Sequence, residues 1–215
     1  MDKVHIKSVE PLKEGSSRFV VPHRMIYEQN GVEKVWDLVD SHDSVGAIIY
    51  NATSNKLVFV SQFRPPVYRR AQLAKTVKLK PNQNVGGDEG IVLEICMGIV
   101  DNKSLSTEET IKKEILEETG FSVSNVEKIG SWVNSVGLLG NTTTLFYSRV
   151  TEKDRVSKGG GRSDEGEMID VVEMSLSEVK DYIESAKVTP VRTTTILLFG
   201  YYWFMANKYS LEMPQ

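Results

Sequence analysis

The sequence predicts an α/β fold in which helices cover a mixed β-sheet, with a small antiparallel β unit at the N-terminus. Short apolar runs typical of buried strands recur along most of the chain. Three longer segments carry helix-start signals, and they do not alternate strictly with the strand-like runs. An Asn-Gly pair between two β-prone runs indicates a hairpin that stands apart from the rest.

The N-terminal β unit is expected over residues 1–43. Asn30-Gly31 is the strongest hairpin signal in the chain, because both residues readily adopt the positive φ angles of a two-residue turn. The flanking strands are predicted at 24–29 and 32–39, and a weak alternation at 4–6 suggests a further strand. A hairpin of this size is not stable alone, so we expect it to pack on another surface.

A second, larger domain is expected over residues 44–215. Its predicted strands are short apolar runs at 45–50, 57–63, 92–97, 145–150 and 168–174. Its predicted helices are at 106–119, 175–185 and 190–208. Ser106 with Glu109, and likewise Ser175 with Glu178, form capping boxes, and Pro190 suits a first helical position.

Composition and charge exclude several classes of protein. The chain has 215 residues, 40% of them hydrophobic, and a net charge of −3, so it can bury a sizeable core but carries no basic field to recruit nucleic acid. The single cysteine, Cys96, excludes a disulfide framework and favours a buried apolar role. The apolar run 196–206 is too short to cross a membrane. Because the first residues also lack the apolar core of a signal peptide, we expect a cytoplasmic protein without a membrane partner.

Three carboxylates gather near the end of the helix predicted at 106–119. Glu114, Glu117 and Glu118 are spaced i, i+3 and i+4, so they share an arc of roughly 100° on a helix. They lie close to Gly120, a helix-stop signal, where the helix dipole already disfavours negative charge. Pairs of glutamates are common on solvated helix faces, but this crowding favours a bound cation.

The longer run from Gly98 to Phe121 resembles the signature of the Nudix hydrolases, which cleave nucleoside diphosphates linked to a second moiety. The family pattern is a glycine, five residues, a glutamate, seven residues, and then Arg-Glu-apolar-x-Glu-Glu-x-Gly-apolar. Lys113 stands where the family has arginine, Leu105 stands where it has the early glutamate, and the spacing before Lys113 is one residue longer. The resemblance implies the Nudix fold, an α/β/α sandwich with a mixed sheet, and activity that depends on Mg²⁺ or alternatively Mn²⁺.

The resemblance also implies roles for individual residues of this run. Glu114 and Glu118 are the expected metal ligands, together with the backbone carbonyl of Met97, and Glu117 is an expected catalytic residue. Magnesium prefers such oxygen donors and keeps several waters. The intact acids support activity, although Lys113 cannot reproduce the bidentate hydrogen bonds of an arginine.

A second acidic segment lies at 157–167, where three glycines precede Asp164, Glu165 and Glu167. In most proteins such a segment is a solvated linker. Related Nudix hydrolases, however, have a mobile catalytic loop with an acidic pair at this place. The resemblance implies that Glu165 is the general base and that Glu167 is a further catalytic and metal-facing acid, with the assignment among the three acids left open.

Three residues outside these motifs resemble substrate contacts of related enzymes. Trp36, which the two-residue turn sets opposite Met25, would stack on the nucleobase, or alternatively pack within the hairpin or a dimer core. Arg64 would contact phosphate, or alternatively be a surface arginine. Glu94 would contact substrate or water, or alternatively be an exposed acid at a strand edge.

Within the family the chain is most similar to the UDP-sugar diphosphatase branch. The similarity rests on Trp36-Asp37, Gln62-Phe63-Arg64-Pro65, the lengthened motif and the glycines before the acidic loop. It implies a homodimer that hydrolyses a nucleotide sugar, UDP-glucose, to UMP and glucose 1-phosphate, with no nucleic-acid partner. Two alternatives stay open: hydrolysis of ADP-ribose or another ADP-sugar, and a Nudix-fold binding protein without activity.

Overall fold

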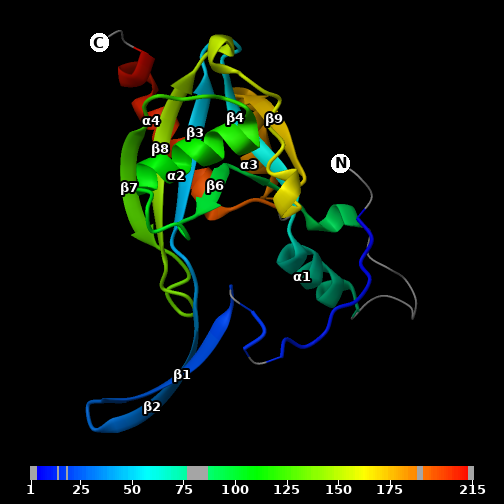
Figure 1. Cartoon of the computed structure of the whole chain (residues 1–215), viewed down its shortest axis with the longest axis vertical. Helices are drawn as coiled ribbons and strands as arrows, with labels where there is room; N and C mark the ends of the chain where they lie inside the picture. The colour runs from blue at the N-terminus through cyan, green and yellow to red at the C-terminus, as the bar shows by residue number, and fades with distance from the viewer. Residues whose placement is uncertain (1–3, 14, 18, 77–86, 188–190, 213–215) are drawn as a thin grey trace.

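The main body of the protein is a β-sheet with helices on both faces, and a long two-stranded hairpin projects from one end of this body (Figure 1). The predicted α/β sandwich with a mixed sheet and a separate antiparallel unit is confirmed. The computed structural model describes residues 4–13, 15–17, 19–76, 87–187 and 191–212.

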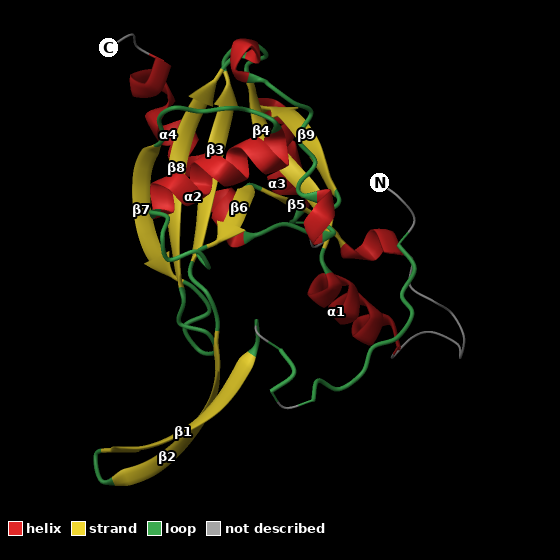
Figure 2. Cartoon of the chain, viewed as in Figure 1, coloured by secondary structure: helices red, strands yellow, loops and turns green. Residues whose placement is uncertain are grey.

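The strands of the described residues belong to two sheets (Figure 2). They are β1 (Val21–Gln29), β2 (Val32–Asp40), β3 (Ser44–Asn51), β4 (Lys56–Phe63), β5 (Ile91–Glu94), β6 (Cys96–Ile99), β7 (Glu127–Val133), β8 (Thr142–Val150) and β9 (Ile169–Ser175). β1 and β2 form the hairpin, and the larger sheet has the order β5-β4-β3-β8-β7, with β6 paired to β3 and β9 paired to β4. Its β3 and β8 run parallel whereas its other pairs are antiparallel, so the sheet is mixed.

The α-helices of the described residues are α1 (Pro65–Thr76), α2 (Thr107–Glu114), α3 (Leu176–Ser185) and α4 (Thr195–Glu212). Shorter helical turns are η1 (Gly87–Gly90), η2 (Ile115–Thr119), η3 (Glu152–Asp154) and η4 (Ser163–Glu165). Both predicted capping boxes are present, because Ser106 and Ser175 each accept a hydrogen bond from the backbone of the glutamate three residues later. The predicted starts of α2 and α3 are therefore confirmed.

One face of the sheet packs on α2. Val45, Ala47 and Ile49 of β3 form a buried cluster with Ile111 and Ile115 of the helix that carries the acids. Each of these side chains is at most 1% exposed. This packing holds the helix against the centre of the sheet.

The opposite face of the sheet packs on α3 and α4. Ile48 and Tyr50, which alternate with the previous set along β3, form a second cluster with Val179 of α3 and with Leu197 and Phe204 of α4. The period-two alternation of a strand thus supplies both layers of the sandwich.

Three elements differ from the prediction. The run 92–97 is not one strand but two, β5 and β6, because the chain changes partner at Ile95: β5 pairs with β4, and β6 pairs with β3. The strand β7 was not predicted because it is an edge strand with mostly exposed side chains and hence no apolar run. The helix α1 was not predicted either, since it has little apolar periodicity.

The last helix begins at Thr195, whereas the predicted first position, Pro190, lies outside the described residues. The segment just before α4 pairs with β5 instead: the hydroxyl of Thr193 donates to the carbonyl of Leu93 at 2.7 Å, and the amide of Leu93 donates to the carbonyl of Arg192 at 3.0 Å. No helix among the described residues is long and apolar enough to cross a membrane.

The hairpin β1–β2 has the predicted turn and register. Asn30 and Gly31 have φ angles of 57° and 77°, as a two-residue turn requires, and Met25 lies opposite Trp36. Residues 4–6 form no strand, so the further strand predicted there is wrong. Most side chains of the hairpin are exposed, because its two strands project from the body rather than pack on it (Figure 1).

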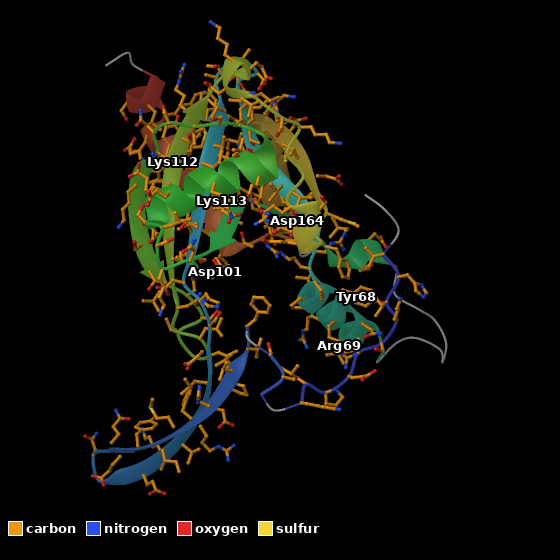
Figure 3. All side chains as sticks on the ribbon, in the orientation of Figure 1. Tyr68, Arg69, Asp101, Lys112, Lys113 and Asp164 are labelled. Carbon is orange, nitrogen blue, oxygen red and sulfur yellow. The ribbon has the colours of Figure 1, made fainter. Side chains whose placement is uncertain are left out.

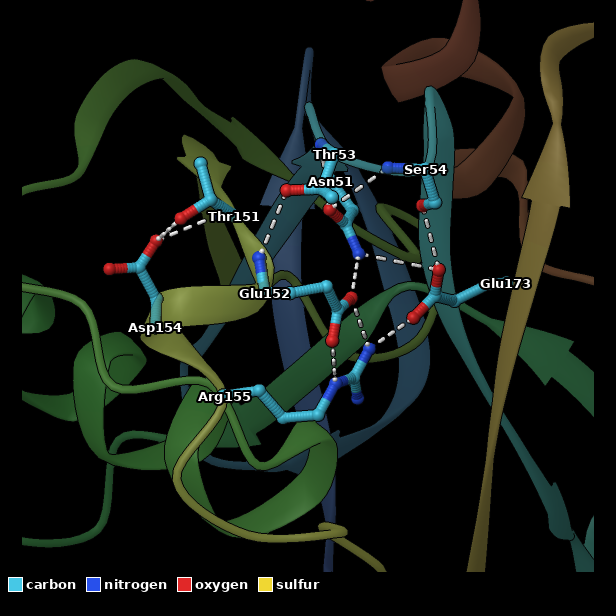
Figure 4. Close-up of polar contacts among 8 residues, drawn as sticks. All are labelled: Asn51, Thr53, Ser54, Thr151, Glu152, Asp154, Arg155 and Glu173. Carbon is cyan, nitrogen blue, oxygen red and sulfur yellow. Dashed lines mark hydrogen bonds and ion pairs between the residues drawn. The ribbon is translucent and has the colours of Figure 1, made fainter.

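Arg155 connects the loop after β8 to the rest of the body (Figure 4). Its guanidinium donates to Glu152 at 2.9 Å and to Glu173 of β9, and Asn51 at the end of β3 donates to Glu152 at 2.5 Å. The same guanidinium lies 4.2 Å from the ring centroid of Phe121, the last residue of the acidic motif. These contacts fix the start of the glycine-rich loop, the acidic loop of residues 157–167, beside the end of the motif.

Candidate active site

The candidate site lies where β6 meets the end of α2. A Cβ added to Gly98 of β6 would lie 2.3 Å from the carboxyl carbon of Glu114. Real Cβ contacts are essentially never closer than 3.0 Å, so any larger residue at Gly98 would displace this carboxylate. Gly98, the first glycine of the motif, is therefore required because there is no room for a side chain between β6 and the Glu114 carboxylate.

The helix that carries the acids changes its hydrogen bonding within the motif. The α-helix ends at Glu114, and Ile115–Thr119 form one π-helical turn, whereas an α-helix was predicted over all of 106–119. Gly120 then ends the helix in the left-handed conformation, with φ 78°, as predicted. Single π turns occur frequently at functional sites and have no clear sequence signal. The predicted α-helical spacing of the acids therefore holds only as far as Glu114.

Glu118 is the buried acid of the motif, with only 3% of the residue exposed. Its carboxylate accepts a hydrogen bond from the backbone amide of Met97 at 3.1 Å and another from the thiol of Cys96. Burial raises the pKa of Glu118 to about 8, the Cys96 hydrogen bond opposes this shift, and the charges of Glu114 and Glu167 add to it. A bound cation would relieve this electrostatic penalty.

Glu114 shares the same negative environment. Burial raises its pKa to about 7, Lys113 opposes the shift, and Glu117, Glu167 and Glu165 add to it. The acids of the motif and those of the glycine-rich loop therefore act on one another, although the two segments are far apart in the sequence. Carboxyl groups with pKa values raised into the neutral range are typical of functional sites.

The glycine-rich loop docks on the end of the helix. The amide of Gly160 donates to the carbonyl of Glu118 at 2.9 Å, and the amide of Gly161 donates to the carbonyl of Glu117 at 3.0 Å. A Cβ on Gly159, whose φ is +67°, would lie 2.4 Å from the carbonyl oxygen of Glu118. The loop thus satisfies carbonyls that the helix end leaves without intrahelical partners.

The three loop acids face different surroundings. The carboxylate of Glu167 accepts a hydrogen bond from the amide of Arg162 at 2.8 Å and is half-buried. The side chains of Asp164 and Glu165 are 68% and 56% exposed, and both pair with the Arg162 guanidinium. The loop therefore presents one half-buried acid, Glu167, and two mostly exposed acids, Asp164 and Glu165.

Glu117 is paired with two cations. Its carboxylate lies 3.3 Å from the ammonium of Lys113 on the same helix and 3.9 Å from the Nε of Arg162 in the loop. In Figure 3, Lys113 lies on the helix, and Asp164 lies in the loop beside the end of that helix. The lysine at the place of the family arginine thus has a direct partner among the acids.

Arg64 and Glu94, predicted as separate substrate contacts, form a bidentate ion pair with distances of 2.9 and 2.6 Å. Glu94 is only 4% exposed, so the alternative of an exposed strand-edge acid is wrong. The hydrogen bonds to Glu94 are the main cause that raises the pKa of Arg64, and the charges of Glu118 and Glu167 contribute. The pair therefore borders the carboxylate cluster, which consists of Glu114, Glu118 and Glu167.

Trp36 of β2 contacts the loop between β7 and β8. Its indole nitrogen donates to the carbonyl of Gly137 at 2.9 Å, and the amide of Val39 donates to the carbonyl of Leu138 at 2.9 Å. The residue remains 51% exposed. Among the described residues, no hydrogen bond or ion pair is found between Trp36 and the carboxylate cluster.

The donor atoms of the cluster suit magnesium. The carboxylates of Glu114, Glu118 and Glu167 and the carbonyl of Met97 are the hard oxygen donors that Mg²⁺ prefers, and burial together with neighbouring acids raises the pKa values of Glu114 and Glu118, a cost that a bound cation would offset. In the part of the chain that the structure describes, no three acidic, histidine or cysteine side chains are already arranged to hold one ion. Some carboxylates would therefore have to turn to hold a cation.

The chain is 35% identical over 203 residues to the uridine diphosphate glucose pyrophosphatase NUDT14 of Bos taurus, an alignment that covers 89% of this chain and 90% of the relative. The chain belongs to the Nudix hydrolase family. The mouse (Mus musculus) protein of the same name is 32% identical over the same shares of the two chains. A GDP-mannose pyrophosphatase of Pectobacterium atrosepticum is 28% identical, with 85% of this chain and 87% of the relative aligned. A scan of protein-family models finds no match.

Two residues that contact the acids of the motif or the loop, Cys96 and Arg162, were not predicted to do so. Cys96 was expected to be buried, and it is, but its thiol also donates to Glu118. Arg162 was not assigned any role, yet it contacts Glu117 on the helix and acids in the loop. A basic residue two positions before Asp164 and three before Glu165, within helix-turn spacing of both acids, was the available signal for Arg162.

Proposed function

We propose that this Nudix hydrolase cleaves the diphosphate bond of a nucleotide sugar, and that its preferred substrate is UDP-glucose, which yields UMP and glucose 1-phosphate. The observation that carries the proposal is the carboxylate cluster around Gly98, Glu114 and Glu118 in a chain 35% identical to a UDP-glucose pyrophosphatase. The GDP-mannose pyrophosphatase among the relatives supports the wider class of nucleotide sugars.

The motif residues would hold one or more Mg²⁺ ions, with Mn²⁺ as a possible replacement. Glu114, Glu118 and Glu167 would contribute carboxylate oxygens, and Met97 would contribute its backbone carbonyl. The cation would supply charge neutralisation to the diphosphate as negative charge develops on it. The close approach of Gly98 to Glu114 leaves no side chain between the strand and the ligands.

Proton transfer falls to the acidic loop in this proposal. Glu165 accepts one proton of the attacking water, the water oxygen forms a new bond to phosphorus as the P–O bond of the diphosphate bridge breaks, and the two monophosphate products leave. Glu117 and Glu167 support the reaction from the helix and from the inner side of the loop. Support for this division of roles comes from the loop's hydrogen bonds to the helix end and from the exposure of Glu165 to solvent.

Substrate recognition is assigned to residues that border the cluster and to the N-terminal unit. Arg64, held by Glu94, supplies positive charge for a phosphate, and Glu94 orients Arg64. Trp36 offers an exposed aromatic face for the base. We assign residues 1–43 to a dimerisation unit whose hairpin packs on a second copy of the chain, because the hairpin is too small to be stable alone and its apolar side chains are exposed.

A substrate panel tests the proposal. UDP-glucose, GDP-mannose, ADP-ribose and ADP-glucose are supplied with Mg²⁺, and phosphate is measured after coupling to a phosphatase, which acts on the products only. We expect the highest kcat/KM for UDP-glucose. A preference for another nucleotide sugar would overturn the substrate assignment, and no hydrolysis of any of them by a protein that still binds Mn²⁺ would favour a binding protein instead.

A further inference from the structure

Arg162 lies at the junction between the Nudix helix and the acidic loop. Its guanidinium is 2.5 Å from Glu165, 2.6 Å from Asp164 and 3.9 Å from Glu117. Its backbone amide donates to the carboxylate of Glu167 at 2.8 Å. One residue thus contacts each acid of the loop and one acid of the helix.

The backbone around Arg162 restricts where this side chain can go. The preceding amide, that of Gly161, donates to the carbonyl of Glu117, and the carbonyl of Arg162 accepts from the amides of Glu165 at 3.1 Å and Glu167 at 3.0 Å. A Cβ on Gly161 would lie 2.8 Å from the Glu167 side chain, so the loop is folded tightly at this point. The Arg162 side chain therefore starts from an anchored position next to the helix.

The charges explain what the guanidinium does there. Asp164 and Glu165 are mostly exposed neighbours of like charge, and Glu117 adds a third negative charge across the junction. Without a cation between them these carboxylates repel one another, which favours movement of the loop away from the helix. A planar guanidinium can pair with two carboxylates at once, and an ammonium cannot match that geometry.

We propose that Arg162 is the positioning residue that seats the acidic loop on the Nudix helix and so holds Glu165 at the carboxylate cluster. This inference rests on the proposed function, because the role of Glu165 belongs to that proposal. The guanidinium also places a positive charge beside the cluster and opposes the binding of a divalent cation there. Loss of Arg162 therefore has two opposite effects: lower turnover and tighter metal binding.

Three variants test this inference. Arg162→Gln removes both the positive charge and the planar guanidinium. Arg162→Lys keeps the positive charge but loses the guanidinium geometry, and Lys112→Gln is the control. Lys112 lies on the same helix as the acids and pairs with Glu108 at 2.6 Å, so its loss changes the net charge equally without touching the cluster. We expect about a tenfold or larger fall in kcat for both Arg162 variants, a KM within about threefold of the parent, and no change for the control.

Two measurements do not depend on activity. In Arg162→Gln, the amides of Glu165, Gly166 and Glu167, which donate to carbonyls within the loop, are expected to exchange hydrogen about tenfold faster. Calorimetric titration with Mn²⁺ alone is expected to show a Kd lower by about threefold for Arg162→Gln and an unchanged Kd for Arg162→Lys. Weaker Mn²⁺ binding by Arg162→Gln would overturn the electrostatic part of the inference.

Other outcomes are equally decisive. Unchanged kcat and unchanged hydrogen exchange in Arg162→Gln would overturn the inference. A raised KM with unchanged kcat would place Arg162 on the substrate rather than under the loop, and would also overturn it. If the parent protein hydrolyses no nucleotide sugar, the proposed function fails, whereas the exchange measurement still decides whether Arg162 seats the loop.

Discussion

Burial is the main physical influence on the single residues of this site. It raises the pKa of Glu118 to about 8 and that of Glu114 to about 7, against an ordinary value of 4.5. At neutral pH such groups retain protons unless a cation replaces them. The affinity of the cluster for a divalent metal is therefore linked to pH.

Replacement of Glu118 tests its proposed metal role. We expect Glu118→Gln to lower kcat by about 100-fold or more at saturating Mg²⁺, because a neutral amide cannot supply the same charge to a cation. The substitution keeps the shape of the side chain, so the fold is retained. Glu108→Gln is the matched control, since Glu108 is exposed on the same helix and, among the described residues, forms an ion pair only with Lys112. Full activity of the parent in excess EDTA would contradict the metal requirement.

The raised pKa values also predict how stability depends on pH. Acids whose folded-state pKa is above the unfolded value contribute stability that is complete below pH 4.5 and is lost as the pH rises through about 7 and 8. In EDTA we expect the Tm of the parent to fall between about pH 5 and pH 8, and Glu118→Gln to reduce this fall, because each pKa unit corresponds to about 1.4 kcal/mol. Scanning calorimetry measures both. A Tm that rises over this range would contradict the burial argument.

Among the elements, the glycine-rich loop is the one whose placement depends most on backbone shape. Both Gly159 and Gly166 have positive φ angles, +67° and +79°, but only Gly159 is crowded: its Cβ would lie 2.4 Å from a carbonyl oxygen, whereas Gly166 has open space. We expect Gly166→Ala to reduce the free energy of unfolding by about 1 kcal/mol and Gly159→Ala by about 2–4 kcal/mol. Urea unfolding measures the difference. Equal losses would show that the loop does not pack tightly on the helix.

The same loop carries the proposed base. We expect Glu165→Gln or Glu167→Gln to lower kcat by about tenfold or more with little change in KM, as for a group that acts mainly in the transition state. Steady-state kinetics with UDP-glucose measures both constants. If neither variant loses tenfold in kcat, the base lies elsewhere.

At the scale of the whole molecule, the hairpin is the unusual feature. It projects from the body and leaves apolar side chains exposed, including Met25, Ile26, Val35 and Trp36 (Figure 1). An isolated two-stranded hairpin has little stability in water, so these side chains need a surface to cover them.

Sedimentation and a Trp36→Ala variant test whether that surface belongs to a second copy of the chain and whether Trp36 contacts the nucleobase of the substrate. We expect sedimentation to show a dimer at micromolar protein. We also expect Trp36→Ala to raise the KM for the nucleotide sugar by an amount equivalent to about 1–3 kcal/mol, the contribution of a stacked base. Met25→Ala, opposite Trp36 on β1, is the control for lost hairpin packing. A fully active monomer, or unchanged kinetics in Trp36→Ala, would restrict the hairpin to a role in folding.

Local signals in the sequence were sufficient for much of this fold. The Asn30-Gly31 turn, the capping boxes at Ser106 and Ser175, and the helix stop at Gly120 all depend on neighbouring residues, and all are confirmed. The family could also be identified from one continuous run, because the motif acids and glycines lie in a single segment. Edge strands such as β7 were missed because they need no apolar run.

The sequence by itself therefore determined the fold class, the family and the segment that carries the acids, since each follows from local periodicity or from one motif. Only the tertiary structure decided the break at Ile95, the burial of Glu118, the Arg64–Glu94 pair and the contacts of Arg162. These features join segments distant in the chain. Their pairing depends on which strand each segment meets and on how much water the packing removes, and neither quantity is present in local sequence.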